Sequence, residues 1–241
     1  MAKSADKSLK KSNQPKLITF LMVNVILILA AIVGYEKTVA VLREIAGGNF
    51  HLLVRLVGIP TVAGLAVGML SWLAPTSWKE SLVFWRVGVR RLPSSEAFTR
   101  IAPADLRVDR AKLEARLGAL PMDHHEQSGL WYRIYRTYSK EPAVIDAHAA
   151  YLLYREMTAL VPSLLLALIV GGLVVHASWG RIVVMSVFVV VEGLIVSLAA
   201  RNAGNRLVAS VLAIEAANPG KPERAMTKRR TATKTERKRT E

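Results

Sequence analysis

The chain has 241 residues, of which 52% are hydrophobic, and it carries 33 Lys and Arg against 18 Asp and Glu, for a formal net charge of +15. It contains no cysteine, which excludes disulfides, thiolate metal sites and cysteine nucleophiles. A soluble domain with this charge would suggest nucleic-acid binding, whereas a membrane protein with this charge would carry it on its cytoplasmic segments. The positions of the charges therefore decide between the two classes.

Four apolar stretches come close to the roughly 20 residues that a helix needs to cross a bilayer. They are 17–35, 52–74, 158–175 and 182–200. The first follows a basic segment and could be a secretory signal peptide, but it is longer than the usual apolar region of one, and no convincing small-x-small cleavage pattern follows it. We therefore expect an uncleaved anchor and four transmembrane helices.

Most of the Lys and Arg residues lie in three segments, which are 1–16, 75–157 and 201–241. Because basic residues accumulate on the cytoplasmic side, these segments and both termini should be cytoplasmic in a cell-membrane protein. The last two spans are separated only by residues 176–181 and should pack antiparallel. The sequence thus predicts an all-α integral membrane protein with four transmembrane helices in two hairpins, 17–74 and 158–200, and a helical cytoplasmic segment between them.

The middle segment, 75–157, contains several helical patterns. Ser77 is a candidate N-cap of a first helix that carries Leu82, Trp85 and Val89 on one stripe. Pro103 suits the first turn of a second helix, with Leu106, Leu113 and Leu117 at helical spacing and Gly118 and Pro121 at its end. A third helix runs through 131–138, and a fourth begins at Pro142 and can continue into the third span.

Two further segments follow the last span. Residues 201–220 continue the helical pattern, with Asn218, Pro219 and Gly220 as its stop signal. Residues 221–241 are basic and have no apolar cluster, so we expect a disordered tail.

Placing a polar side chain inside a bilayer costs free energy, so a polar residue in an apolar span usually has a structural or functional role. Glu192 lies near the middle of the fourth span, Asn24 lies at a comparable depth in the first, and Arg55 lies near the outer end of the second. Glu192 could line a pore or a proton-linked site, or it could be a protonated or hydrogen-bonded acid that holds helices together. We favour the second interpretation, because the spans contain few other polar groups.

Small residues at four-residue spacing mark candidate helix-packing faces. They are Gly64 and Gly68 in the second span, Ala30 and Gly34 in the first, and Gly193 in the fourth. Such spacing allows helices to approach closely, either within one bundle or between copies of the chain.

An aromatic and basic pattern stands out in the third cytoplasmic helix, formed by Trp131, Arg133, Tyr135, Arg136 and Tyr138. It could be a surface for a partner or a negatively charged small ligand, or a stacking surface for nucleic acid. Its helical spacing favours an aromatic core stripe with the arginines outside. The nearby run 123–126, Asp-His-His-Glu, is interpreted as a polar turn, because adjacent histidines do not share a helix face, and we expect no metal site.

No phosphate-binding loop, zinc-peptidase motif or GxSxG motif is present, so we expect no catalytic residues and no cofactor. The expected partners are the bilayer, anionic lipid through the C-tail, a second copy of the chain, and a cytoplasmic protein or small ligand, with nucleic acid disfavoured. One hypothesis is a non-enzymatic module whose cytoplasmic segment senses a ligand or partner and controls an oligomeric four-helix bundle or pore. The alternative is a membrane-anchored scaffold that recruits proteins through the middle segment and tail.

Overall fold

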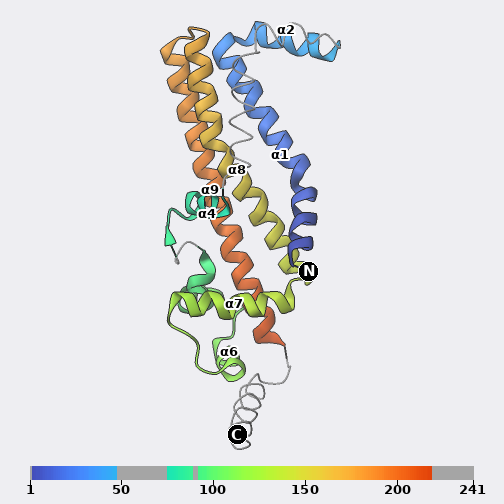
Figure 1. Cartoon of the computed structure of the whole chain (residues 1–241), viewed down its shortest axis with the longest axis vertical. Coiled ribbons are helices and arrows are strands. Elements are labelled where there is room, and N and C mark those ends of the chain that lie inside the picture. Colours follow the sequence, from blue (N-terminus) through green and yellow to red (C-terminus); the bar gives the residue numbers. More distant parts are fainter. Residues whose placement is uncertain (1, 48–74, 89–91, 219–241) are drawn as a thin grey trace, which may run out of the picture. The chain divides into compact units, whose positions relative to one another are not determined.

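The structure, a computed structural model, describes residues 2–47, 75–88 and 92–218. Every regular element in these residues is helical, which confirms the all-α prediction. Figure 1 shows the long helices α1, α8 and α9. Three of the helices are long and apolar enough to cross a membrane. The predicted second span, 52–74, and the predicted disordered tail, 221–241, lie outside the described residues.

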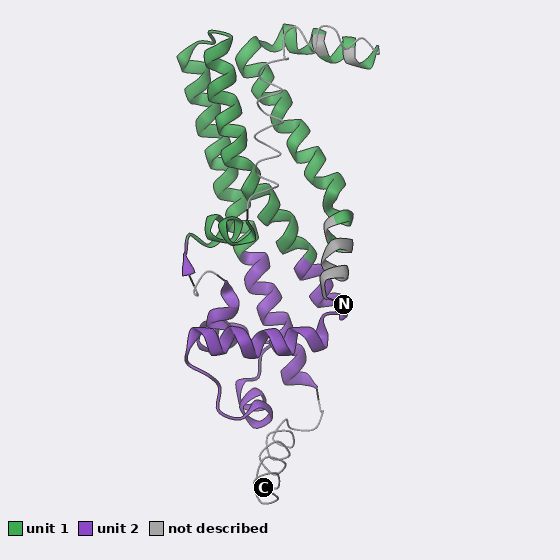
Figure 2. Cartoon of the chain, in the orientation of Figure 1, with its two compact units in different colours: residues 1, 3–85, 149–201 green, residues 2, 86–148, 202–241 purple. Residues whose placement is uncertain are grey.

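The chain divides into two compact units, apart from its first two residues (Figure 2). Of the described residues, unit 1, green in Figure 2, contains 3–47, 75–85 and 149–201, and unit 2, purple, contains 86–88, 92–148 and 202–218. Each unit thus combines segments that are far apart in the sequence.

Unit 1 begins with α1, Ala2–Val33, which includes both the basic N-terminal segment and the first apolar stretch. The helix ends at Gly34, whose φ of +100° lies in the region that favours glycine. A second helix, α2 (Tyr35–Ala46), follows at once. The connection that follows the first predicted span is therefore helical over the part that the structure describes.

The other two apolar helices are α8, Pro142–Val174, and α9, Trp179–Ala217. The prediction that the helix starting at Pro142 continues into the third span is confirmed, and α8 also continues through Pro162. Residues 201–217, where the sequence continues a helical pattern, form the end of α9. Only the four residues 175–178 connect the two helices, and His176 there has a φ of 53°.

The three long helices share a core in unit 1. Its buried side chains are Ile28, Ile32, Val161, Leu164, Leu168 and Val189, from α1, α8 and α9. Where α8 and α9 approach, a Cβ atom added to Gly193 would lie 2.7 Å from Cγ1 of Val161. By contrast, many large apolar side chains of α9 are exposed, among them Val184 and Ile195. An exposed apolar surface of this extent is typical of helices that contact lipid.

A short helix, α4 (Thr76–Phe84), completes the described part of unit 1. It begins one residue before the predicted N-cap, so Ser77 lies inside its first turn, and no side chain caps it. The helix ends at Trp85, which has a left-handed φ of 52°. Val89, the third residue of the predicted stripe, lies outside the described residues.

Unit 2 is built from short elements and from the ends of the two long helices. In chain order they are the 3-10 helix η2 (Pro93–Glu96), the π-helix η3 (Ala97–Ile101), α5 (Ala102–Ala104), α6 (Arg110–Leu117), α7 (His124–Tyr138), the start of α8 and the end of α9. They enclose one apolar core, which includes Phe98, Leu113, Val144 and Leu212. The predicted helix through 131–138 is confirmed as α7.

The predicted start of the second helix of this segment, at Pro103, is wrong. The short α5 stops at Ala104, and the next residue, Asp105, is extended. Its carboxylate accepts a hydrogen bond from the backbone N–H of Arg107, a local bond that competes with helix formation. A new helix, α6, starts at Arg110 with Asp109 as its N-cap, and it ends at Gly118 as predicted. Leu106, assigned to the apolar stripe, is fully exposed instead.

Candidate functional site

The polar residues predicted inside the first and fourth spans lie next to each other in unit 1. Nδ2 of Asn24 donates a hydrogen bond to Oε1 of Glu192 at 3.3 Å, and the two residues are 168 positions apart in the sequence. Nδ2 also contacts the backbone oxygen of Phe20, one turn earlier in α1. Asn24 is only 1% exposed. The acid in α9 is therefore paired with an amide of α1.

One oxygen on each side of this pair has no hydrogen-bond partner among the described residues. These two buried atoms are Oδ1 of Asn24 and Oε2 of Glu192. Both can only accept if the acid is ionised, but a proton on Oε2 would allow it to donate to Oδ1. A protonated Glu192 and Asn24 would then form a ring with two hydrogen bonds and no net charge.

A second buried polar cluster of unit 1 joins α4 to α8, and the sequence analysis missed it. Nζ of Lys79 lies 2.5 Å from Oε2 of Glu156, and Nη2 of Arg155 lies 2.7 Å from the other carboxylate oxygen. Glu80 is also buried. The cluster contains two bases and two acids, so its formal charges cancel. It therefore offers no excess charge with which to bind an ion.

These side chains are unusually buried for charged groups. Lys79 is 7% exposed and Arg155 is 5% exposed. Removing one partner of a buried ion pair costs about 3–5 kcal/mol, because the other charge is left without compensation. A signal was present in the sequence, since a basic–acidic pair directly precedes the third apolar stretch and another closely follows the second. Spacing alone could not show that the two pairs meet.

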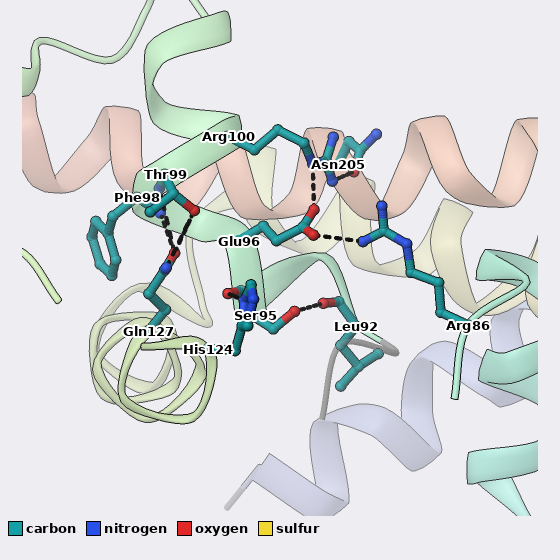
Figure 3. A network of polar contacts seen from close by, with 10 residues as sticks. All are labelled: Arg86, Leu92, Ser95, Glu96, Phe98, Thr99, Arg100, His124, Gln127 and Asn205. Carbon is teal, nitrogen blue, oxygen red and sulfur yellow. Dashed lines mark hydrogen bonds and ion pairs between the residues drawn. The ribbon is translucent and has the colours of Figure 1, made fainter. Parts of the chain in front are cut away.

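Unit 2 contains a polar network around η2 and η3 (Figure 3). The carboxylate of Glu96 accepts hydrogen bonds from Nη1 of Arg86 at 2.8 Å and from Nε of Arg100 at 2.5 Å. Burial alone would raise the pKa of this carboxyl, but the two arginines outweigh burial and hold the pKa below its usual value. Arg100 also contacts Oδ1 of Asn205 in α9, at 3.4 Å. The network thus ties η2 and η3 to the end of α9 that belongs to unit 2.

Gln127 of α7 supports the same segment from the other side (Figure 3). This residue is completely buried, and its Oε1 accepts from the backbone N–H of Phe98 at 3.0 Å and of Thr99 at 3.3 Å. Its Nε2 donates to the backbone oxygen of Met122 at 3.0 Å. The side chain therefore satisfies the backbone at the start of the π-helix, a role that the sequence did not suggest.

The aromatic stripe of α7 faces the core of unit 2. Trp131 and Tyr138 are buried, while Arg133 and Arg136 are exposed, which is the arrangement that the helical spacing favoured. Tyr135 is half-buried, stacks on Trp131 and contacts Nδ1 of His148 through its hydroxyl at 3.1 Å. Of the aromatic and basic residues predicted as a partner surface, only the two arginines are exposed, and Tyr132 beside them is 49% exposed.

The run 123–126 was predicted to be a polar turn, but it forms the N-cap and the first residues of α7. Asp123 caps it by accepting from the backbone N–H of His125 and Glu126. His124 Nδ1 lies 2.9 Å from the backbone oxygen of Ser95. Among the residues that the structure describes, no three acidic or histidine side chains group as a metal site would require.

The residues predicted to pack helices together differ in their surroundings. Gly193 lies against Val161, whereas a Cβ atom at Gly34 would meet nothing within 4 Å, so this glycine ends α1 and does not pack. Ala30 is half-buried in α1. The other three predicted residues, Arg55, Gly64 and Gly68, lie outside the described residues.

No protein-family model matches the chain, and no curated protein or solved structure is significantly similar to it.

Proposed function

We propose that the chain is a non-enzymatic, multi-pass protein of the cell membrane with four transmembrane helices in two hairpins and both termini in the cytoplasm. In this proposal, unit 2 is a cytoplasmic sensor of a protein partner or small ligand. It controls an oligomeric bundle formed by the spans, and that bundle conducts ions or acts on the membrane.

One observation supports a coupling between ligand sensing in unit 2 and a response of the membrane helices. Helices α8 and α9 each run without a break from residues of unit 1 to residues of unit 2. Because a continuous helix transmits rotation or displacement along its length, a change in unit 2 would be carried to the apolar parts of both helices. The Glu96 network and the core of unit 2 both include residues of the α9 end, and a ligand that altered either would act on that helix.

The membrane-anchored scaffold is the second candidate, and the Asn24–Glu192 contact favours it. A pore needs polar side chains that face its lumen. The acid best placed for that purpose is hydrogen-bonded to Asn24 of the same chain. A scaffold would instead use the spans only as an anchor and recruit proteins through unit 2 and the basic tail.

Conductance of the purified protein in planar bilayers distinguishes the two candidates. The sensor proposal expects single-channel currents whose frequency changes when unit 2 is perturbed, for instance by Arg100→Ala, which removes the contacts with Glu96 and Asn205. The matched control is Arg133→Ala, at an exposed arginine of the same unit. Absence of any current in the wild type and in both variants would reject the pore and leave the scaffold.

We also propose that the basic C-terminal segment, 221–241, binds anionic lipid. Basic residues near an anionic surface contribute about 1 kcal/mol each. Deleting the segment should weaken binding of the detergent-solubilised protein to vesicles that contain phosphatidylserine, and added salt should weaken binding of the intact chain in the same way. Equal binding with and without the segment would reject this partner.

A further inference from the structure

Helix α4 has the opposite polarity from a helix on the surface of a soluble protein. Its charged residues, Lys79 and Glu80, are 7% and 9% exposed and lie on the buried side with Val83, whereas Trp78 is 42% exposed and Trp85, which ends the helix, is 62% exposed. A surface helix in water places its charged residues outward and its apolar residues inward. The reversed arrangement indicates that something other than bulk water lies against the exposed face of α4.

The inward face of α4 is firmly attached to α8. Lys79 pairs with Glu156, as described above, and the ring of Phe84 lies 6.2 Å from the ring of Tyr151. The buried ion cluster therefore fixes how α4 is rotated about its own axis. With Lys79 held inward, Trp78 and Trp85 cannot turn toward α8 without breaking the ion pair.

The end of α4 is attached to α9 at the boundary of an apolar run. The backbone oxygen of Val83 accepts hydrogen bonds from Oγ of Ser197 at 3.2 Å and from Nε of Arg201 at 2.6 Å. The guanidinium of Arg201 also lies 3.9 Å from the centre of the Trp85 ring, within range of a cation–π interaction. Arg201 is the first charged residue after the apolar run 182–200 that contains Glu192.

The length of this run matches the thickness of a bilayer. From Ile182 to Ala200 the rise along α9 is about 27 Å, and from Trp179 to Arg201 it is about 33 Å, at 1.5 Å per residue, against about 30 Å for the hydrocarbon core. Trp179 is itself 67% exposed. The exposed tryptophans thus lie at both ends of the apolar run, where aromatic residues anchor proteins at the membrane–water interface.

We infer that α4 is an interfacial helix, whose Trp78 and Trp85 insert between lipid headgroups while its charged residues remain in the buried cluster with α8. The occupant of its exposed face is the bilayer, because Val83 and Trp85 attach α4 to Ser197 and Arg201, where the apolar run of α9 ends. The inference depends on the proposal that α1, α8 and α9 span a membrane. In this arrangement, α4 forms a fixed contact between the lipid surface and α8 and α9, the two helices that continue into unit 2.

Tryptophan quenching by brominated lipids in proteoliposomes tests this position. Single-tryptophan proteins would retain Trp78, Trp85 or Trp131, with the other four tryptophans changed to Phe. A further protein would carry Leu166→Trp in a chain without other tryptophans, because Leu166 is 48% exposed in the apolar part of α8. We expect Trp78 and Trp85 to lose more fluorescence with bromine near the headgroups than with bromine near the chain ends. Leu166→Trp should show the reverse order, and buried Trp131 should be quenched by neither lipid.

The controls separate this inference from the membrane proposal. If lipid quenches Leu166→Trp while aqueous iodide alone quenches Trp78 and Trp85, α4 faces water and the inference is wrong, but the spans remain. If lipid quenches none of the probes, the membrane proposal itself fails. Protection of Trp78 and Trp85 from both bromine and iodide would mean that protein covers α4, and would also overturn the inference.

A second measurement avoids replacing the tryptophans. The chain has no cysteine, so Ser77→Cys and Leu82→Cys each provide a single labelling position on α4. A nitroxide at Leu82, on the same helix face as Trp78 and Trp85, should collide more often with dissolved oxygen than with a water-soluble nickel chelate. The opposite preference at Leu82 would contradict an interfacial helix even if the tryptophan variants did not fold.

Discussion

At the scale of single residues, two pairs of buried polar side chains join helices of unit 1, one inside the apolar stretches and one beside them. Asn24 and Glu192 meet across α1 and α9, and Lys79 and Glu156 meet across α4 and α8. Each pair replaces the water that its members would contact outside a membrane. Pairing of this kind stabilises a bundle and reduces the number of groups that could line a hydrated path.

Substitutions at Glu192 should separate a structural acid from an ionised one. Glu192→Gln retains both a donor and an acceptor toward Asn24, so the protein should keep its thermal stability in detergent. Glu192→Leu removes the hydrogen bonds and should lower stability by about 0.6 kcal/mol for each bond lost, an average for membrane proteins. Differential scanning fluorimetry of the three proteins measures the change. A larger loss for Gln than for Leu would show that the charged form matters.

Glu96 should make unit 2 sensitive to acid. Because the two arginines hold the pKa of Glu96 below its usual value, its contribution to stability is present at neutral pH. It is lost as the pH falls from about 5 through the lower pKa of the folded state. Denaturant unfolding can be followed by the fluorescence of Trp131 in a chain without other tryptophans. As the pH falls, the free energy of unfolding should decrease more in the protein that retains Glu96 than in the Glu96→Gln variant.

The control for this measurement is Glu126→Gln, at an exposed acid of α7. It should follow the acid sensitivity of the unsubstituted chain. Identical pH profiles for Glu96 and Glu96→Gln would reject a stabilising role for the two arginine contacts.

At the scale of elements, α8 and α9 are the two longest helices of the described residues, and close contacts set the distance between them. Gly172 and Gly193 occupy positions where any side chain would meet the neighbouring helix. In a membrane, where lipid is as apolar as the helices, such close packing is a main source of helix association. The contact of α8 with α9 therefore depends on residues that have no side chain.

Gly193→Ala should weaken this contact. The new Cβ would lie 2.7 Å from Cγ1 of Val161, a β-branched side chain with little freedom to move. Overpacking of this kind typically costs about 1–3 kcal/mol. Gly180→Ala, near the start of the same helix, is the matched control, because its Cβ would lie 3.8 Å from the nearest atom. Equal melting temperatures for both variants would show that the helices can separate without loss.

At the scale of the whole molecule, the proposed topology assigns a side of the membrane to each connecting segment. Unit 2 and both termini should lie in the cytoplasm, and α2 should lie outside. The basis is the distribution of Lys and Arg along the chain. This arrangement would give a cytoplasmic ligand access to unit 2, as the proposed function requires.

Single cysteines can test this topology without background labelling, since the chain has none of its own. A membrane-impermeant maleimide added to intact cells should label Ala46→Cys at the exposed end of α2 but not Leu106→Cys, which is fully exposed in unit 2. Tags at both chain ends should report the cytoplasm. If the mature protein began near Tyr35, the first apolar stretch would be a signal peptide and the four-span topology would be wrong.

The sequence alone determined where the long apolar helices lie, because the length of an apolar run and its flanking charges are local properties of the chain. It also indicated that the helix from Pro142 continues into a span and that the aromatic side of α7 faces inward, since both follow from helical spacing. It failed at α5 and α6, where the side chain of Asp105 bonds to nearby backbone and Asp109 begins a new helix.

Only the tertiary structure decided which polar groups meet. Glu192 lies 168 residues from Asn24, and Lys79 lies 77 residues from Glu156, so no periodicity within one helix could pair them. The reversed polarity of α4 was hidden for the same reason. Which face of a nine-residue helix is buried depends on the helices that it contacts, and here a buried ion pair turns its tryptophans outward.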